Sequence, residues 1–337
     1  MKPSAREHIG FIKIFTLSFL AFSITILVIN IYVDPRGVFG TGKYPVLVAT
    51  ARAEKAALLE SFNPRPQVLI MGSSHTMRYS PEIVYNLLGL RTFNLSVNAG
   101  KIEDFVALLR YSIDELKIRP KMIILGMCQR TLCLLENEDF DKRLTSNAVL
   151  MKYVPLNPLI KLWRNIVIYG ETLNWNYLKD VKRSIAFSKT KSGLVKYLFH
   201  SDGFLSKEGS FNKKGTFSKM EVFRKDCDVT GFSEERIKYF KIFRDICKKN
   251  NITLKIVIEP YAPEYIQQVN LFDGSYTRLN QQLLDLLRTL NVDNDYEIYD
   301  FSDIDKFGGV DEFMGYAHPS IRNSSLILQS ILGKRIF

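Results

Sequence analysis

The sequence predicts a three-layer α/β/α fold around a central parallel β-sheet, preceded by one N-terminal transmembrane helix. From Val68 to Leu332, short apolar runs alternate with amphipathic segments. This alternation is typical of a parallel sheet with helices on both faces. Residues 11–33 form a separate stretch that is almost wholly apolar. The apolar fraction of 46% over 337 residues is ample for a sizeable core, so disorder is excluded as the main state.

The N-terminal stretch is interpreted as an uncleaved signal anchor over residues 11–33, after a polar tail at residues 1–10. Ile14–Val33 alone supplies 20 residues, about 30 Å of helix, which matches the hydrocarbon core of a bilayer. The run is too long for a typical secretory signal, and no small-x-small cleavage site follows it.

The flanking charges predict the orientation of this anchor. Three basic residues lie before or at its start and two lie after it, namely Lys2, Arg6 and Lys13 against Arg36 and Lys43. Because basic residues favour the cytoplasmic side, the N-terminus is expected to be cytoplasmic and the main domain extracytoplasmic.

Residues 34–63 are expected to be a linker and a lead-in helix. Asp34–Gly40 has Pro and Gly at short spacing and predicts an interfacial turn. Pro45–Phe62 carries Ala, Leu, Glu and Lys at helical spacing. The main α/β domain is expected over residues 64–337.

Within this domain the strands and helices follow in alternation. Strands are expected at Val68–Met71, Thr92–Leu95, Met122–Leu125, Ile252–Ile258 and Tyr296–Tyr299. Helices are expected at Pro81–Leu88, Ile102–Leu116, Glu234–Lys249, Tyr276–Leu290 and Ser320–Leu332. Parallel sheets of this kind bind ligands at the carboxyl ends of their strands.

Residues 130–231 interrupt the alternation. They contain Trp163 and Trp175, many Tyr and Phe, and segments rich in turn formers. No sheet or heptad period emerges, so we expect an insertion over the active face rather than an independent domain.

The net charge of +11 favours anionic surroundings, such as a membrane surface or an acidic polymer. A solvated basic surface is the plainer alternative. The basic residues are spread along the chain without an Arg-rich arm or an RNA-binding signature, so no nucleic-acid partner is expected.

The four cysteines are Cys128, Cys133, Cys227 and Cys247. They form no CxxC pair and have no histidine at a metal-ligand spacing, which argues against a zinc site. Disulfides in an oxidising compartment and buried thiols both remain open. No metal or other cofactor is expected.

The stretch Gln67–Thr76 carries the candidate chemistry. Its strand stops at Gly72 and passes directly into Ser73, Ser74 and His75, ahead of the helix at Pro81. Such a turn can project a serine hydroxyl above a sheet and leave backbone N–H groups free. The alternative is a tight turn with helix-capping serines.

His318 is the histidine best placed to work with Ser74. It lies in the loop Gly315–Ser320 between the last strand and the last helix, and Pro319 favours an extended conformation for it. In a parallel sheet this loop is at the same edge as Ser74. A serine with an imidazole base is the minimum for nucleophilic acyl transfer.

Together these motifs resemble the SGNH-hydrolase (GDSL-like) superfamily, which has a flavodoxin-like fold. Gly72-Ser73-Ser74 matches its first block, and Asn94-Leu-Ser-Val-Asn-Ala-Gly100 resembles its second. His318 lies where its C-terminal Asp-x-x-His block would fall. The closest branch is membrane-anchored and extracytoplasmic, similar to the D-alanyl-lipoteichoic-acid transfer protein and to polysaccharide O-acetyltransferases.

The resemblance implies roles for particular residues. Ser74 would be the nucleophile and His318 the base, with backbone N–H groups of Ser74 and of Ala99 or Gly100 forming the oxyanion hole. Ser73, His75 and Asn98 are expected to line the pocket.

Two positions depart from the family pattern. Gln129 follows the third strand where the family has an Asn donor to the oxyanion, so this donor is either missing or replaced by Gln129. Gly315 occupies the position of the family's orienting Asp. Asp311 is the candidate substitute, with Glu312 and Asp303 as alternatives, or a Ser–His dyad suffices.

The sequence therefore predicts a membrane-anchored serine esterase or O-acyltransferase that acts on an envelope polysaccharide or other anionic polymer. A separate membrane acyl-donor protein is a partner that the resemblance implies. The alternative is a catalytically lapsed module that binds glycan or scaffolds an export or modification complex.

Overall fold

The computed structural model describes residues 5–41, 43–45, 47, 51–133, 144, 147–154, 156–190, 199–206 and 231–333. The chain divides into two compact units. We call them the anchor unit (Met1–Ala49, Thr145–Met151 and Pro155–Lys196) and the sheet unit (Thr50–Leu144, Lys152–Val154 and Tyr197–Phe337).

The sheet unit is built on a five-stranded, wholly parallel sheet in the order β2-β1-β3-β4-β5. Its strands are β1 (Val68–Met71), β2 (Thr92–Asn94), β3 (Met122–Met127), β4 (Thr253–Ile258) and β5 (Tyr296–Asp300). This is the flavodoxin-like strand order, in which ligands bind where the order reverses, at the carboxyl ends of β1 and β3. The predicted fold class is confirmed.

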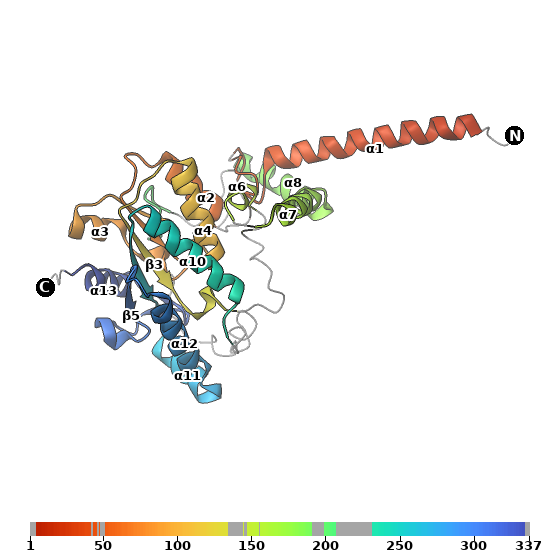
Figure 1. The fold of residues 1–337 in the computed structure, drawn as a ribbon. Coiled ribbons are helices and arrows are strands. Elements are labelled where there is room, and N and C mark those ends of the chain that lie inside the picture. The colour runs from red at the N-terminus through yellow and green to blue at the C-terminus, as the bar shows by residue number, and fades with distance from the viewer. Residues whose placement is uncertain are drawn as a thin grey trace. The chain divides into compact units, whose positions relative to one another are not determined.

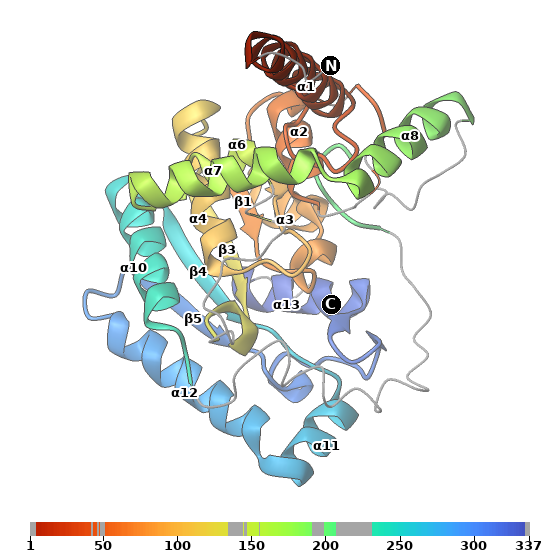
Figure 2. The ribbon, with the colours of Figure 1, turned by 90° about the vertical axis from the view of Figure 1, so that its right-hand side faces the viewer.

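Helices cover both faces of the sheet (Figures 1 and 2). On one face lie α3 (Pro81–Leu88) and α13 (Ile321–Leu332). On the other lie α4 (Ile102–Arg110), α10 (Glu234–Lys249) and α12 (Ser275–Leu290).

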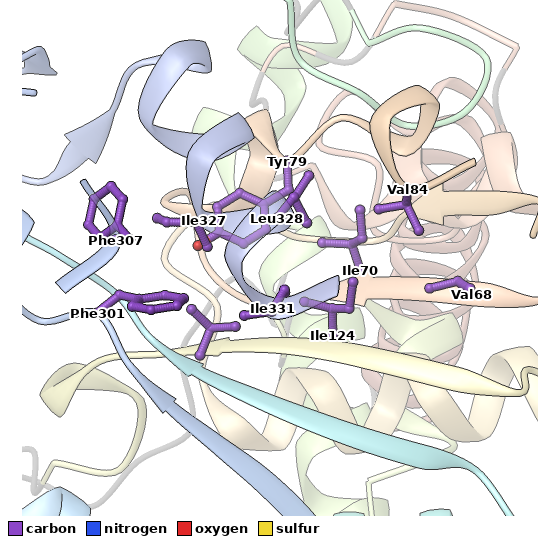
Figure 3. Close-up of a cluster of buried hydrophobic side chains, with 11 residues drawn as sticks. Val68, Ile70, Tyr79, Val84, Ile124, Phe301, Phe307, Ile327, Leu328 and Ile331 are labelled. Atoms are coloured by element: carbon purple, nitrogen blue, oxygen red, sulfur yellow. The ribbon is translucent and has the colours of Figure 1, made fainter. Parts of the chain in front are cut away.

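Alternating strand residues divide the core between these faces. Val68 and Ile70 of β1 point toward α3 and α13, and Ile124 of β3 joins them. Figure 3 shows Ile70 and Ile124 facing Leu328 and Ile331 of α13. All three strand residues are completely buried, which is why this stretch of sequence is continuously apolar.

Short elements surround the carboxyl edge of the sheet. Single turns of 3₁₀ helix follow β1, β3 and β5, namely η1 (Thr76–Arg78), η3 (Gln129–Thr131) and η5 (Ile304–Phe307). A two-stranded hairpin, β6 (Phe313–Met314) with β7 (His318–Pro319), precedes α13. The lead-in helix α2 spans Arg52–Ser61.

Most predicted elements lie within a few residues of their expected bounds. The helix expected at Ile102–Leu116 ends as α4 at Arg110 and continues as one π-helical turn, η2 (Tyr111–Glu115). Helix α11 (Pro263–Asp273) was not predicted, although Pro263 stands at its first turn.

The anchor unit contains α1 (Ala5–Val33), α6 (Ala148–Met151), α7 (Pro158–Thr172) and α8 (Trp175–Thr190). Its His8–Val33 segment is long and apolar enough to cross a membrane. The side-chain amide of Asn30 donates to the Thr172 carbonyl, and Arg36 pairs with Asp180 at 2.9 Å. The end of α1 is therefore bound to α7 and α8.

The predicted turn after the anchor is held by Asp34. Its carboxylate accepts hydrogen bonds from the backbone N–H groups of residues 38–41, at 2.7 to 3.3 Å. Burial raises the pKa of Asp34 although each of these bonds lowers it.

The sequence predicts that residues 130–231 form one insertion on the α/β domain. In the structure, α6, α7 and α8 form a unit with α1, whereas residues 199–206 pack with the sheet unit. The backbone N–H of Asn94 donates to Asp202, and that of Leu205 donates to Met77. Residues 134–143, 191–198 and 207–230 lie outside the described part of the chain.

Candidate active site

Two loops at the carboxyl edge of the sheet bring Ser74 and His318 together. The Ser74 Oγ lies 2.9 Å from the His318 Nε2. Ser74 is in the turn after β1, and His318 begins β7, 244 residues further along the chain. Both side chains are half-buried. A hydroxyl at this distance can donate its proton to a neutral imidazole.

The other nitrogen of the imidazole faces a backbone oxygen. The His318 Nδ1 lies 3.4 Å from the Met314 carbonyl, and the two residues are paired across the β6-β7 hairpin. Gly315 turns this hairpin with a φ of 65°, a conformation that favours glycine. Because Met314 accepts at Nδ1, this contact favours the tautomer in which Nε2 can accept the serine proton.

The acids considered for orienting the imidazole lie elsewhere. Asp311 is exposed in the loop before β6. Glu312 accepts a hydrogen bond from Ser320 and pairs with Arg322, and Asp303 caps η5 through the N–H of Asp305.

The backbone donors expected at an oxyanion hole differ in their availability. Within the described residues, the N–H groups of Ser74 and Ala99 have no hydrogen-bond partner. The N–H of Gly100 instead donates to the Val97 carbonyl at 3.2 Å. Of the two alternatives from the sequence, Ala99 is therefore the available donor.

The loop that carries Ala99 packs directly on the nucleophile turn. Val97 donates to the Gly72 carbonyl at 3.0 Å. A Cβ on Gly100 would lie only 2.9 Å from that same carbonyl, so only glycine permits the approach. The turns after β1 and β2 are thus fixed against each other, and Ala99 itself has a φ of 47°.

A buried arginine, Arg52 of α2, supports this loop from behind. Its guanidinium makes a bidentate pair with Asp104 at 2.7 Å for both bonds and donates to the Asn98 carbonyl at 3.1 Å. Both side chains of the pair are fully buried. Bidentate geometry fixes orientation as well as distance, so Arg52 positions the residue that precedes Ala99.

The Gln129 side chain has a hydrogen-bond partner on α12. It is buried in η3, and its amide nitrogen donates to the Asn280 Oδ1 of α12 at 3.1 Å. The side chain therefore links η3 to α12. The neighbouring loops are linked by Lys101, whose ammonium donates to the Arg130 carbonyl at 2.6 Å.

Of the three residues expected to line the pocket, two lie inside the turn. Ser73 is buried, and its hydroxyl accepts from the N–H of His75 at 3.3 Å. The His75 ring is buried, with its centroid 5.4 Å from that of His318 and 5.0 Å from that of Tyr261. Asn98 is partly exposed and is held by Arg52 through its backbone.

Behind the dyad lies a buried pair that the sequence did not indicate. Glu259 follows β4 and is 1% exposed, and its Oε2 lies 3.7 Å from the His75 Nδ1. Among the described residues, neither carboxyl oxygen has a hydrogen-bond partner, and nor does that ring nitrogen. A Cβ on Gly126 would lie 2.6 Å from the Glu259 Oε1, so glycine in β3 makes room for the carboxyl.

Burial decides the protonation of this pair. It raises the pKa of Glu259 well above its usual value. It also lowers the pKa of His75, with further lowering by the charges of His318, Arg130 and Arg78. Burial therefore favours a neutral carboxylic acid beside a neutral imidazole.

The same causes act on His318. Burial, followed by the positive charges of Arg78 and Arg130, lowers its pKa to about 4, while the hydrogen bond with the Met314 carbonyl acts in the opposite direction. His318 is thus neutral near pH 7, the form that can accept a proton from Ser74.

Sequence reasoning missed Arg52, Arg78, Arg130 and Glu259. All four lie in or beside predicted helices and strands, where a charged residue normally faces solvent. Their proximity to the dyad depends on side-chain directions that no local pattern reveals. One signal was available for Glu259, because it directly follows a predicted strand at the ligand-binding edge.

Some solved structures are distantly similar to this chain. No protein-family profile and no curated protein matches the chain. Among solved structures, a GDSL-like lipase from Bacteroides thetaiotaomicron is similar, with 11% identity and a TM-score of 0.36, covering 82% of this chain and 91% of that one. A Bacteroides fragilis protein described as an acylhydrolase has 10% identity and a TM-score of 0.35, covering 83% and 93%.

Proposed function

We propose that this chain is a membrane-anchored, extracytoplasmic serine esterase or O-acyltransferase that acts on a cell-envelope polysaccharide or another anionic polymer. The observation that carries the proposal is the 2.9 Å contact between the Ser74 Oγ and the His318 Nε2. The unpaired N–H groups of Ser74 and Ala99, within the described residues, support it.

The proposed reaction proceeds through an acyl-enzyme. The Ser74 Oγ attacks the ester carbonyl carbon while the His318 Nε2 takes the hydroxyl proton. The N–H groups of Ser74 and Ala99 stabilise the negative oxygen of the tetrahedral intermediate. Its collapse breaks the ester bond, and His318 returns the proton to the leaving alcohol.

The second half determines whether the protein is an esterase or a transferase. His318 takes a proton from water or from a glycan hydroxyl, which then attacks the acyl-Ser74 carbonyl. Water yields a carboxylic acid, whereas a glycan hydroxyl yields a new ester. The transferase version needs an acyl donor, and a membrane acyl-donor protein is the proposed partner.

The location and substrate class have their own support. The His8–Val33 helix is long and apolar enough to span a bilayer. Lys2, Arg6 and Lys13 lie before or near the start of that helix, against Arg36 and Lys43 after its end, which favours a cytoplasmic N-terminus. The net charge of +11 favours an anionic polymer over a neutral one.

A lapsed, glycan-binding module is the second candidate. The observation that favours it is the partner of the His318 Nδ1, which is a backbone carbonyl rather than a carboxylate. A carbonyl dipole stabilises the imidazolium less than a full negative charge does.

A fluorophosphonate probe distinguishes the two candidates. If Ser74 is an activated nucleophile, the full-length protein is labelled and Ser74→Ala is not. His318→Gln removes the base, so its labelling should fall at least about 10³-fold.

Ser73→Ala is the matched control, because it removes a neighbouring hydroxyl that is not bonded to His318. It should be labelled like the wild type. Wild-type protein that resists the probe, or Ser74→Ala protein that still reacts, would remove the esterase proposal and leave the binding module.

A further inference from the structure

Helix α7 of the anchor unit is amphipathic, but its apolar side is the exposed one, unlike that of an ordinary surface helix. Its buried residues, Ile168 and Thr172, share one side with the partly buried Lys161 and Arg164. At 100° per residue these four positions fall within one narrow stripe. Lys161, Arg164 and Thr172 therefore lie on the side of α7 that faces the protein.

The opposite side is apolar and exposed. It is formed by Leu159, Leu162, Trp163, Ile166, Tyr169 and Leu173, the last just past the end of the helix. Contiguous exposed apolar surfaces of this kind mark sites of interaction. A helix that turns its apolar side outward fits a lipid environment better than water.

The position of α7 relative to α1 identifies what covers this surface. The Asn30 side chain, one turn before the end of α1, donates to the Thr172 carbonyl at the end of α7. Figure 1 shows α1 lengthwise with α7 seen nearly end-on, and in Figure 2 α1 is end-on with α7 lengthwise. α7 therefore crosses the end of α1 instead of running beside it.

This crossing places α7 where a membrane surface would be. If α1 spans the bilayer, its C-terminal end is at one interface and a helix that crosses this end lies in the interfacial plane. Trp163 and Trp175 are 65% and 69% exposed, and tryptophan is enriched at interfaces. The adjacent α8 exposes a row of cations suited to anionic headgroups, namely Lys179, Lys182, Arg183 and Lys189.

We propose that α7 is an interfacial helix that embeds its apolar side between the headgroups and acyl chains of the leaflet at the C-terminal end of α1. This inference rests on the membrane anchoring contained in the proposed function. Its ligand is the lipid itself, bound through burial of the apolar side chains.

Trp163 provides a direct probe, because the chain contains only two tryptophans. The full-length Trp175→Phe variant is reconstituted into vesicles of phosphatidylcholine with a quarter phosphatidylglycerol. Part of the phosphatidylcholine carries bromine on the upper or on the terminal part of its acyl chains. We expect blue-shifted Trp163 emission, quenched about twofold by the shallow bromines and less by the deep ones.

Variants on the two sides of α7 sharpen the test. Leu159→Asn with Ile166→Asn, added to Trp175→Phe, should lower the quenching to near that of unbrominated vesicles. Asn165→Ser with Glu171→Ser is the matched control, since both residues are exposed and polar on the same helix. It should leave the quenching unchanged.

Carbonate extraction of the same vesicles separates the inference from the anchoring. Protein that resists extraction but shows unquenched, red-shifted Trp163 emission would overturn the inference and leave the anchor intact. Blue-shifted emission that bromine does not quench would place a protein or a second copy on α7, which also overturns it. If carbonate extracts the protein from the vesicles, the membrane anchor is refuted. Quenching of Trp163 measured before the extraction then decides whether α7 itself contacts lipid.

Discussion

At the scale of single residues, the low pKa of His318 determines the pH range in which the site can work. A base must be unprotonated, and burial with two nearby arginines lowers the pKa of His318 to about 4. We therefore expect kcat/KM for an activated acetyl ester to stay level from neutral pH down to about pH 5 and to fall below about pH 4. An acid limb near the ordinary histidine value, about 6.5, would contradict this.

Glu259 predicts an unusual dependence of stability on pH. Its pKa is raised in the folded protein, so its carboxyl stays protonated there at pH values where the unfolded chain releases the proton. The stability that the protonated Glu259 carboxyl contributes to the folded protein is fully present below about pH 4.5, and it is lost as the pH rises toward the pKa in the folded protein. Glu259→Gln lacks the titration and should become more stable than the wild type, by about 1–3 kcal/mol, between about pH 5 and 8.

Glu103→Gln is the matched control for this prediction. Glu103 is equally buried but accepts a bidentate ion pair from Arg236, at 3.0 and 3.2 Å. Loss of its charge leaves Arg236 uncompensated and should cost about 3–5 kcal/mol at neutral pH. Thermal unfolding of the detergent-solubilised chain measures both variants. If both substitutions destabilise the protein, Glu259 is ionised in the folded state and its assignment is wrong.

At the scale of elements, the β6-β7 hairpin determines how the imidazole is held. Gly315 has a φ of 65°, and space is open where its Cβ would lie. Only backbone conformation therefore opposes a side chain here. Gly315→Val should strain the turn by about 1–2 kcal/mol, loosen the Met314–His318 contact and lower kcat several-fold with little change in KM.

Gly315→Asn serves as the control, because asparagine adopts positive φ more readily than valine. It should retain most of the wild-type kcat. Equal loss in both variants would show that the added side chain, rather than the hairpin conformation, disturbs the site.

The strands and the helices that cover the sheet were predictable because the local pattern of apolar residues indicates which side chains are buried. Val68–Met71 and Glu234–Lys249 have the same bounds in the sequence prediction and the structure. Helix α7 was not predicted, because its apolar side faces outward. A search for an apolar stripe that faces the core therefore interprets this segment as an irregular loop rich in aromatic residues. Strand order depends on long-range pairing that no local pattern contains.

The site shows the same division. Ser74 and His318 could be singled out because each follows or precedes a recognisable element at the ligand-binding edge. The free donor at Ala99 could not be separated from Gly100, because that depends on which N–H the turn already uses. The contact of Met314 with His318 arises from backbone pairing, which the identity of the side chains does not reveal.

At the scale of the whole molecule, charge is the property most directly linked to the proposed substrate. The net charge of +11 attracts a polyanion over distances that salt shortens from about 30 Å at 0.01 M to about 3 Å at 1 M. The chemical step at Ser74 involves a neutral ester and lies in a partly buried site, where screening is weaker.

Raising the salt from about 0.02 M to 0.5 M should therefore lower kcat/KM for an acylated anionic polysaccharide about tenfold or more. For a small neutral acetyl ester, kcat/KM should change less than about twofold over the same range. Steady-state kinetics with both substrates on one preparation makes the comparison. Equal salt sensitivity would show that salt acts on the protein itself, and a salt-independent polymer reaction would mean that the basic surface takes no part in recognising the substrate.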